Sequence, residues 1–85
     1  MKIPQLQRIK TIFDIMNDCQ YHELKDIVEK VNDKLCANYC RSTIEKDMDF
    51  MRMNFDADDE WISSTSGVKF ENPIDFFERL KIWLV

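Results

Sequence analysis

Apolar side chains recur at steps of three and four through the first part of the chain, and this spacing constrains the fold more than any other feature. It places those side chains on one face of an α-helix. The spacing predicts three helices, over residues 5–17, 23–34 and 41–53. Their apolar stripes are Leu6, Ile9, Ile12, Phe13 and Met16 in the first, Leu24, Ile27, Val28, Val31 and Leu35 in the second, and Ile44, Met48 and Met51 in the third.

The pattern changes after these helices. Two short strands are predicted, over 61–64 and 68–70, and the turn between them ends at Gly67, the only glycine in the chain. A glycine there is free to adopt the positive φ of a hairpin turn. Pro73 suits the first turn of a helix. The apolar residues that follow it therefore predict a last helix over 74–85.

Three helices, a β-hairpin and a C-terminal helix, in that order, predict an α+β fold that is mostly helical. This is the arrangement of a winged helix–turn–helix, in which the second and third helices form the helix–turn–helix and the hairpin is the wing. A chain of 85 residues forms one such domain. We expect residues 1–72 to form the winged helix and residues 73–85 to form the C-terminal helix.

Composition excludes several classes of protein. A hydrophobic content of 45% and a charged content of 33% are those of a folded globular domain. No apolar run approaches the ~20 residues that cross a bilayer, and residues 1–5 lack the apolar stretch of a secretory signal, so we expect a cytoplasmic protein without membrane contact. The single glycine excludes a Gly-rich phosphate loop, and an odd number of cysteines, three, indicates reduced thiols.

The stretch from Tyr39 to Met48 resembles the recognition-helix signature of WYL-domain bacterial transcription regulators and of related DeoR-type repressors. In that family the signature reads roughly V-S-x-R-T-I-x-R-D-L. Thr43-Ile44 and Asp47-Met48 keep the centre of the pattern. Two positions depart from it, because Cys40 replaces the usual capping serine and Ser42 replaces an arginine.

The later segment from Phe55 to Pro73 is similar to the wing region of the same family, where an aromatic strand ends in a D-P or N-P step. Here that step is Asn72-Pro73. The resemblance covers most of the chain. It implies the DNA-binding domain of a transcription regulator.

The third helix also predicts contacts with DNA by itself. At about 100° per residue, the side chains opposite its buried stripe are Ser42, Lys46, Asp49 and Met53. Polar and cationic groups near a helix N-terminus reach base edges and phosphates in a major groove. The expected base readers are Ser42, Glu45 and Lys46, and the expected phosphate contacts are Arg41, Thr43 and Arg52, with Lys69 on the wing. We therefore hypothesise a sequence-specific double-stranded DNA-binding transcriptional regulator, with residues 41–53 in the major groove and the wing, 61–70, on the backbone.

The charge of the chain favours an alternative. The net charge is −4, and the acids within residues 56–60 would oppose phosphate contacts. The alternative is a winged-helix protein-interaction module that does not bind DNA and meets a protein partner through an acidic surface. A continuous basic surface would favour DNA if it joined Lys2, Lys10, Arg41, Lys46, Arg52 and Lys69.

We expect no enzyme activity, no cofactor and no metal site. The single histidine, His22, has no nucleophile spaced to work with it. Cys19-x2-His22 and Cys36-x3-Cys40 flank opposite ends of the second helix, about 18 Å apart, whereas zinc ligands lie within about 2.3 Å of one ion. We interpret the three cysteines as small, partly buried thiols.

Two kinds of side chain are assigned to packing. Met48, Met51 and Met53 are expected to pack against neighbouring helices. Asp47 points toward the flank of the buried side of the third helix, and a half-buried carboxylate needs a partner. A base on the first helix is the expected partner, with Arg8 as the candidate.

The C-terminal helix carries more apolar surface than one small domain is expected to cover. A stripe about 100° wide is enough for a helix that rests on a domain, and the apolar residues here span more. We expect this helix to form a homodimer, which also suits a palindromic DNA site. The expected dimerisation residues are Phe76, Leu80, Trp83 and Leu84. Two alternatives are that the helix leads into a further domain that would cover this surface, and that the helix only caps the core.

Overall fold

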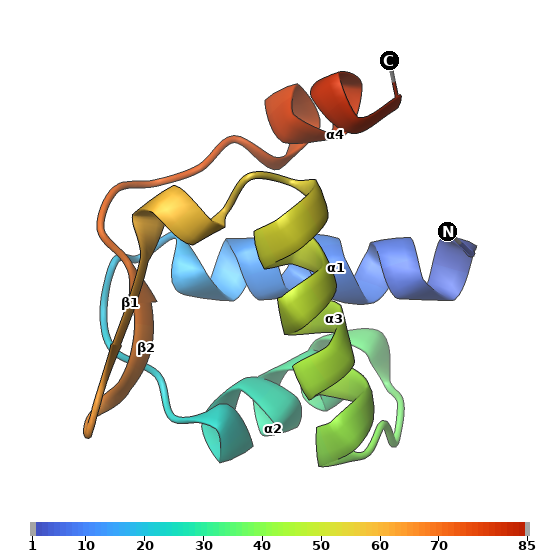
Figure 1. Ribbon diagram of the computed structural model, residues 1–85. Helices are drawn as coiled ribbons and strands as arrows, with labels where there is room; N and C mark the ends of the chain where they lie inside the picture. The colour runs from blue at the N-terminus through green and yellow to red at the C-terminus, as the bar shows by residue number, and fades with distance from the viewer. Residues whose placement is uncertain (1, 85) are drawn as a thin grey trace.

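The computed structural model describes residues 2–84, except for the side chain of Leu84, and divides them into four α-helices, one 3₁₀ turn and one β-hairpin (Figure 1). In chain order these are α1 (Ile3–Met16), α2 (Leu24–Leu35), α3 (Arg41–Asn54), η1 (Asp58–Glu60), β1 (Trp61–Ser64), β2 (Gly67–Phe70) and α4 (Phe76–Leu84). The fold is α+β and mostly helical, as the sequence predicts. Its layout is compatible with a winged helix.

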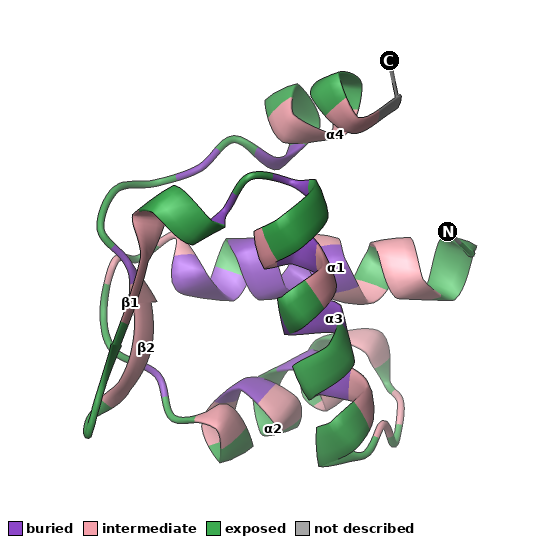
Figure 2. Cartoon of the chain, in the orientation of Figure 1, coloured by how far each residue is buried: buried purple, intermediate pink, exposed green. Residues whose placement is uncertain are grey.

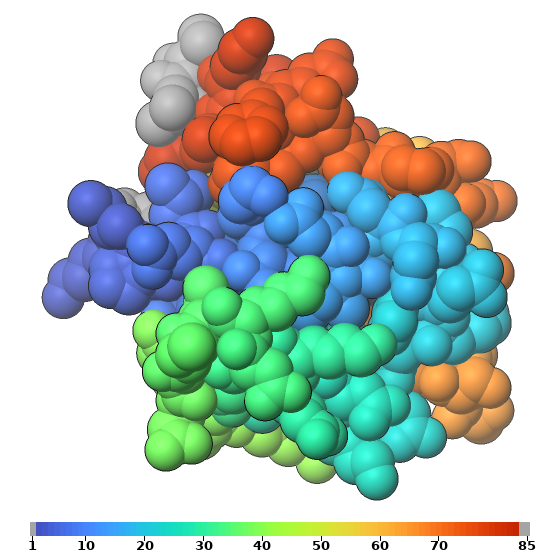
Figure 3. Space-filling view, turned by 180° about the vertical axis from the view of Figure 1, so that it is seen from behind, coloured from blue at the N-terminus to red at the C-terminus, as the bar shows by residue number. Residues whose placement is uncertain are grey.

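α1 is the central helix. It contacts α2 and α3, and the view from behind shows it between α2 and α4 (Figure 3). Its predicted apolar stripe is confirmed, with Leu6 packed at the edge of the core and Ile9, Ile12, Phe13 and Met16 fully buried. Thr11 and Ile15 are buried as well. The buried surface is wider than predicted because helices cover α1 from more than one side.

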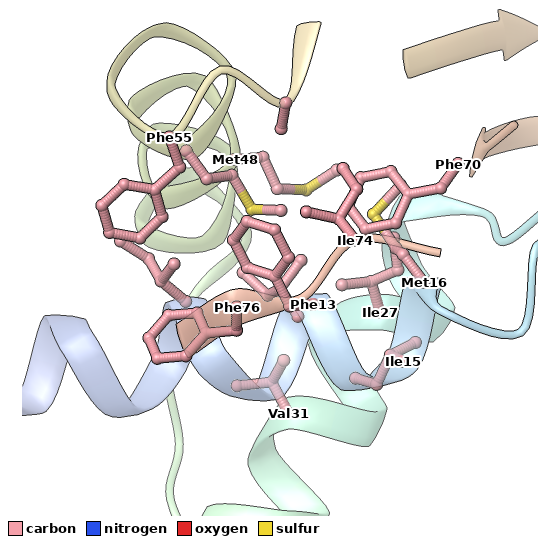
Figure 4. Packing of buried hydrophobic residues seen from close by; sticks show 14 of the residues in the cluster. Phe13, Ile15, Met16, Ile27, Val31, Met48, Phe55, Phe70, Ile74 and Phe76 are labelled. Atoms are coloured by element: carbon pink, nitrogen blue, oxygen red, sulfur yellow. The ribbon is translucent and has the colours of Figure 1, made fainter. Parts of the chain in front are cut away.

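The core is built around the ring of Phe13 (Figure 4). Its centroid lies 5.4 Å from that of Phe76, 5.6 Å from that of Phe70 and 5.9 Å from that of Phe55. Phe76 lies in α4, Phe70 lies in β2, and Phe55 is the residue that directly follows α3. Aromatic pairs in such tilted and edge-to-face geometries contribute about 0.5–1.5 kcal/mol each beyond their burial of area. One aromatic cluster therefore joins α1, α3, the hairpin and α4.

Backbone hydrogen bonds of His22 attach the hairpin to the helical part of the domain. β1 pairs with β2 in antiparallel register along its whole length, up to the pair of Ser64 and Gly67. At the other edge of β2, the N–H of His22 donates to the carbonyl of Val68, and the N–H of Val68 donates to the carbonyl of His22, both at 2.9 Å. This bridge holds the hairpin against the segment between α1 and α2.

Gly67 is required for that contact. Its φ is +117°, and a Cβ at this position would lie 2.2 Å from the carbonyl oxygen of His22. The predicted positive φ is confirmed. The turn itself consists of Thr65 and Ser66, and Gly67 is the first residue of β2. The glycine thus permits the close approach of two backbones as well as the unusual backbone angle.

α4 begins at Phe76, two residues later than predicted. Asn17, at the end of α1, holds Ile74 outside the helix: its side chain donates to the Ile74 carbonyl and accepts from the Ile74 N–H, both at 2.9 Å. The carboxylate of Asp75 then caps the helix, because it accepts from the N–H groups of the second and third helical residues at 2.9 and 3.3 Å. Pro73 therefore precedes the helix. The sequence predicted this proline in the first turn, and that prediction is wrong.

Candidate nucleic-acid interface

α3 turns a polar, mostly exposed side away from the core (Figure 2). Its buried residues include Ile44, Met48 and Met51, and its outward residues are Ser42, Lys46, Asp49 and Met53, which confirms the predicted division of the helix. The packing role predicted for Met53 is wrong, because this side chain is 82% exposed. Met53 lies nine positions after Ile44. At about 100° per position this amounts to about two and a half turns of the helix, so Met53 points directly away from the buried side.

Asp47 is buried on the side of α3 that faces α1. Its side chain is 2% exposed, and both carboxylate oxygens accept hydrogen bonds from the guanidinium of Arg8. Arg8 also lies over the ring of Tyr39, with its guanidinium carbon 4.6 Å from the centroid. The hydrogen bond to Asp47 raises the pKa of Arg8, while burial acts in the opposite direction. The predicted pair is confirmed, and the charge of Asp47 is compensated within the protein.

A hollow lies between α3 and the N-terminal end of α1. It is lined by Lys2, Gln5 and Arg8 from the first segment and by Thr43, Lys46 and Asp47 from α3, and we call it the α1–α3 hollow. Within residues 2–84, neither lysine forms an ion pair. Because Arg8 and Asp47 compensate each other, the uncompensated charges around the hollow are the two ammonium groups of Lys2 and Lys46.

The N-terminal end of α3 carries three further side chains that the sequence predicts as DNA contacts. Arg41 and Ser42 are exposed in its first turn. The Nε of Arg41 donates to Oε1 of Glu45 at 3.0 Å, one turn along the helix. The structure therefore brings Arg41, Ser42, Glu45 and Lys46 together on the outer side of one helix end.

Arg52 lies on the other side of α3, and its charge is compensated there. Its Nη2 and Nε donate to Oδ1 of Asp58 at 2.8 and 3.0 Å, and its guanidinium carbon lies 5.0 Å from the ring centroid of Trp61. This side of α3 borders a second hollow, toward the hairpin, which Glu45 and Asp49 also line. The structure does not bring Arg52 together with Lys46.

The remaining predicted bases point elsewhere. Val68 lines the hollow between α3 and the hairpin, so Lys69, the next residue of β2, faces the opposite side of the hairpin. There its Nζ lies 4.7 Å from the ring centroid of Tyr21. Lys10 donates to Asp14 at 2.7 Å and lies toward α4. The continuous basic surface considered in the sequence analysis is therefore not formed by its six bases, Lys2, Lys10, Arg41, Lys46, Arg52 and Lys69.

Acidic side chains gather from the middle of α3 to the start of the hairpin. Residues 49–60 contain five acids and one arginine, a net charge of −4, which equals the formal net charge of the whole chain. The acids are Asp49, Asp56, Asp58, Asp59 and Glu60. The rest of the chain is neutral in sum. Within α3, residues 41–47 carry two bases and two acids and residues 48–54 carry one of each, so the excess of acid follows the C-terminal end of the helix.

The sequence predictions include Lys2 and Lys10 in a possible basic surface but assign no DNA contact to α1. They give Gln5 no role, and they do not place Lys2 beside Lys46. A signal was present, because residues 2–12 contain three bases and no acid. The spacing of apolar residues does not reveal that this segment ends next to α3, since that depends on how the two helices cross.

Two of the three cysteines are more exposed than predicted. Cys19 is partly buried, but Cys36 and Cys40 are exposed because they flank the turn between α2 and α3. The Sγ of Cys40 lies 3.1 Å from Oγ of Ser42 and 3.3 Å from Oγ1 of Thr43. Hydrogen bonds from these two residues lower the pKa of Cys40 to about 6. Among residues 2–84, no three His, Cys, Asp or Glu side chains are grouped so that they could hold a metal ion.

The apolar residues of α4 pack mainly against their own domain. Phe76 is 6% exposed and belongs to the core, and Leu80 and Trp83 pack against that core. These three side chains are therefore engaged within the chain, and the side chain of Leu84, the fourth predicted dimer residue, lies outside the described residues. The exposed apolar side chains of α4 are Phe77, at 59%, and Ile82, at 64%. Dimerisation through α4 stays a prediction, which a measurement of solution mass would test.

Comparison of the chain with known protein families, with curated proteins and with solved structures gave no match. Of the helices described, none combines the length and the apolar character needed to cross a membrane. The functional interpretation therefore rests on the sequence, the geometry and the charges of the chain itself.

Proposed function

We propose that the chain is a winged helix–turn–helix domain that binds double-stranded DNA as a transcriptional regulator. In this proposal α2 and α3 are the helix–turn–helix, and β1 and β2 are the wing. Three features support it: the order of the elements, the attachment of the hairpin through His22 to the segment between α1 and α2, and the resemblance of residues 39–48 to the recognition helices of WYL-domain and DeoR-type regulators.

The observation that carries the proposal is the N-terminal half of α3. It is exposed at Ser42 and Lys46, it borders a hollow with two uncompensated ammonium groups, and its buried acid, Asp47, is compensated by Arg8. Helix ends with such donors and cations enter the major groove, where they meet base edges and phosphates. We assign Ser42 and Glu45 to base edges and Arg41 to a flanking phosphate.

The acids of residues 49–60 determine which end of α3 approaches DNA. A carboxylate 4 Å from a phosphate costs about 1 kcal/mol even at the dielectric constant of water, and five acids lie in this segment, of which Asp58 is paired with Arg52 and Asp59 with Arg79. Inserting the C-terminal half of α3 would accumulate this repulsion. The N-terminal half therefore faces the duplex, and the acidic segment stays away from the phosphate backbone.

Selection of duplexes from a random library at low salt, followed by anisotropy titrations, tests this function. Lys46→Ala should weaken binding about tenfold, equivalent to about 1.4 kcal/mol. The matched control is Lys81→Ala, which removes an exposed lysine of α4 and should leave the affinity unchanged. Absence of duplex affinity at low salt for every selected pool would overturn the proposal.

The acidic segment favours a second function, the docking of a protein partner. Residues 49–60 include the exposed Met53 and are followed by the half-buried Trp61, so charge and apolar contact are adjacent there. A basic protein surface is the complementary partner. This function would replace DNA binding if the duplex selection fails and if Asp49→Lys, but not Asp33→Lys on α2, abolishes binding of a partner.

A further inference from the structure

The α1–α3 hollow combines groups from two helices that are distant in sequence. Lys2 and Gln5 come from the N-terminal end of α1, and Thr43 and Lys46 come from the first half of α3. Together they offer two ammonium groups, one amide and one hydroxyl. These are the groups that proteins use to contact phosphate oxygens.

The residues that line this hollow carry no uncompensated negative charge, and the Sγ of Cys40 lies 3.3 Å from the hydroxyl of Thr43 at its edge. Asp47 is the only acid among its lining residues, and the guanidinium of Arg8 binds both of its carboxylate oxygens. The first turn of α1 contains no acid, and neither does the first turn of α3. An anion that enters the hollow therefore meets two cations and no free carboxylate from the residues that line it.

We propose that the α1–α3 hollow binds a backbone phosphodiester of the DNA, so that the DNA-binding surface extends onto α1. This inference rests on the proposed function and assigns Lys46 to the backbone, together with Lys2, although the sequence suggested a base edge. The side-chain amide of Gln5 donates a hydrogen bond to the same phosphate. The hollow on the hairpin side of α3 does not take this role, because Glu45 and Asp49 line it and Arg52 is already paired with Asp58.

Salt dependence is the readout specific to this interaction. On duplex DNA, each phosphate that a protein neutralises adds about 0.9 to the magnitude of the slope of log K against log salt concentration. Lys2→Gln should therefore reduce the magnitude of the slope, by at most about 0.9 because Lys46 contacts the same phosphate, and it should weaken binding to the selected duplex and to a scrambled duplex by the same factor. Lys81→Gln is the charge-matched control and should leave the slope unchanged. Thermal unfolding of each variant checks that the fold is intact.

The outcomes separate this inference from the proposed function. If the native chain binds duplex DNA but Lys2→Gln keeps the native slope, the phosphodiester assignment is wrong and the DNA-binding function stands. If the native chain has no duplex affinity, both are wrong. An NMR titration with inorganic phosphate distinguishes the other source of this chemistry. Amide shifts at Lys2, Gln5, Thr43 and Lys46 saturating at micromolar phosphate would assign the hollow to the free anion and overturn a backbone contact.

Discussion

Arg8 of α1 and Asp47 of α3 form an ion pair in which the side chain of Arg8 is 13% exposed and that of Asp47 2% exposed. The pair has two consequences. It ties the two helices together at the point where they cross, and it cancels the one negative charge in the lining of the α1–α3 hollow. The stability of the domain and the charge of the α1–α3 hollow therefore depend on the same contact.

Replacing one partner of this pair should destabilise the domain strongly. Arg8→Ala leaves the carboxylate of Asp47 buried without a counter-charge, which we expect to lower the free energy of unfolding by about 3 kcal/mol. The control is Arg41→Ala, which breaks an exposed pair with Glu45 and should cost at most about 0.5 kcal/mol. Urea unfolding followed by circular dichroism measures both. Equal losses in the two variants would show that Arg8 and Asp47 are not coupled as described.

Gly67 should not tolerate a side chain. The added Cβ of Gly67→Ala would meet the carbonyl oxygen of His22 at 2.2 Å, and alanine is strained at a φ of +117°. We expect a loss of at least about 2 kcal/mol in the free energy of unfolding, together with faster hydrogen exchange at the Val68 amide that bonds His22. Ser66→Ala, in the exposed turn beside it, should change the stability by less than about 0.5 kcal/mol. Unchanged exchange at Val68 in the alanine variant would contradict the close approach of the two backbones.

Cys40 should react as a thiolate at neutral pH. Hydrogen bonds from Ser42 and Thr43 lower its pKa to about 6, so the thiolate fraction is nearly complete at pH 7 and falls as the pH drops through 6. The rate of alkylation by iodoacetamide, followed by mass spectrometry of the Cys40 peptide, should reach half its maximum near pH 6. Ser42→Ala should move that midpoint upward, because it removes the largest of the stabilising hydrogen bonds. A midpoint near the ordinary thiol value of about 8.5 in the native chain would refute the prediction.

Local patterns predicted the helices and the division of α3. The apolar spacing of α1 and α3 depends only on the helical period, and Ser42, Lys46 and Asp49 lie on the outer side where that period puts them. The partner of Asp47 was also predictable, because a buried carboxylate needs a base and Arg8 was available on the first helix.

Contacts between distant segments were not predictable in this way. The start of α4 depends on the side chain of Asn17 binding the backbone of Ile74, 57 positions later. The need for Gly67 depends on the approach of His22 from another part of the chain. The separation of Lys69 from the bases of α3 has the same cause. Strand alternation puts the side chains of Lys69 and Val68 on opposite faces of the hairpin, but the docking of the hairpin decides which of these faces meets α3.

Amide shift mapping by NMR with a selected DNA duplex tests the direction in which α3 meets DNA. The largest shifts on binding should fall in residues 41–46 of α3 and in residues 2–8 at the start of α1, which border the α1–α3 hollow. Residues 56–60, in the acidic segment, should shift least. If the largest shifts instead fall in residues 49–60 and in the hairpin, and residues 41–46 do not shift, the result would contradict DNA binding through the N-terminal end of α3.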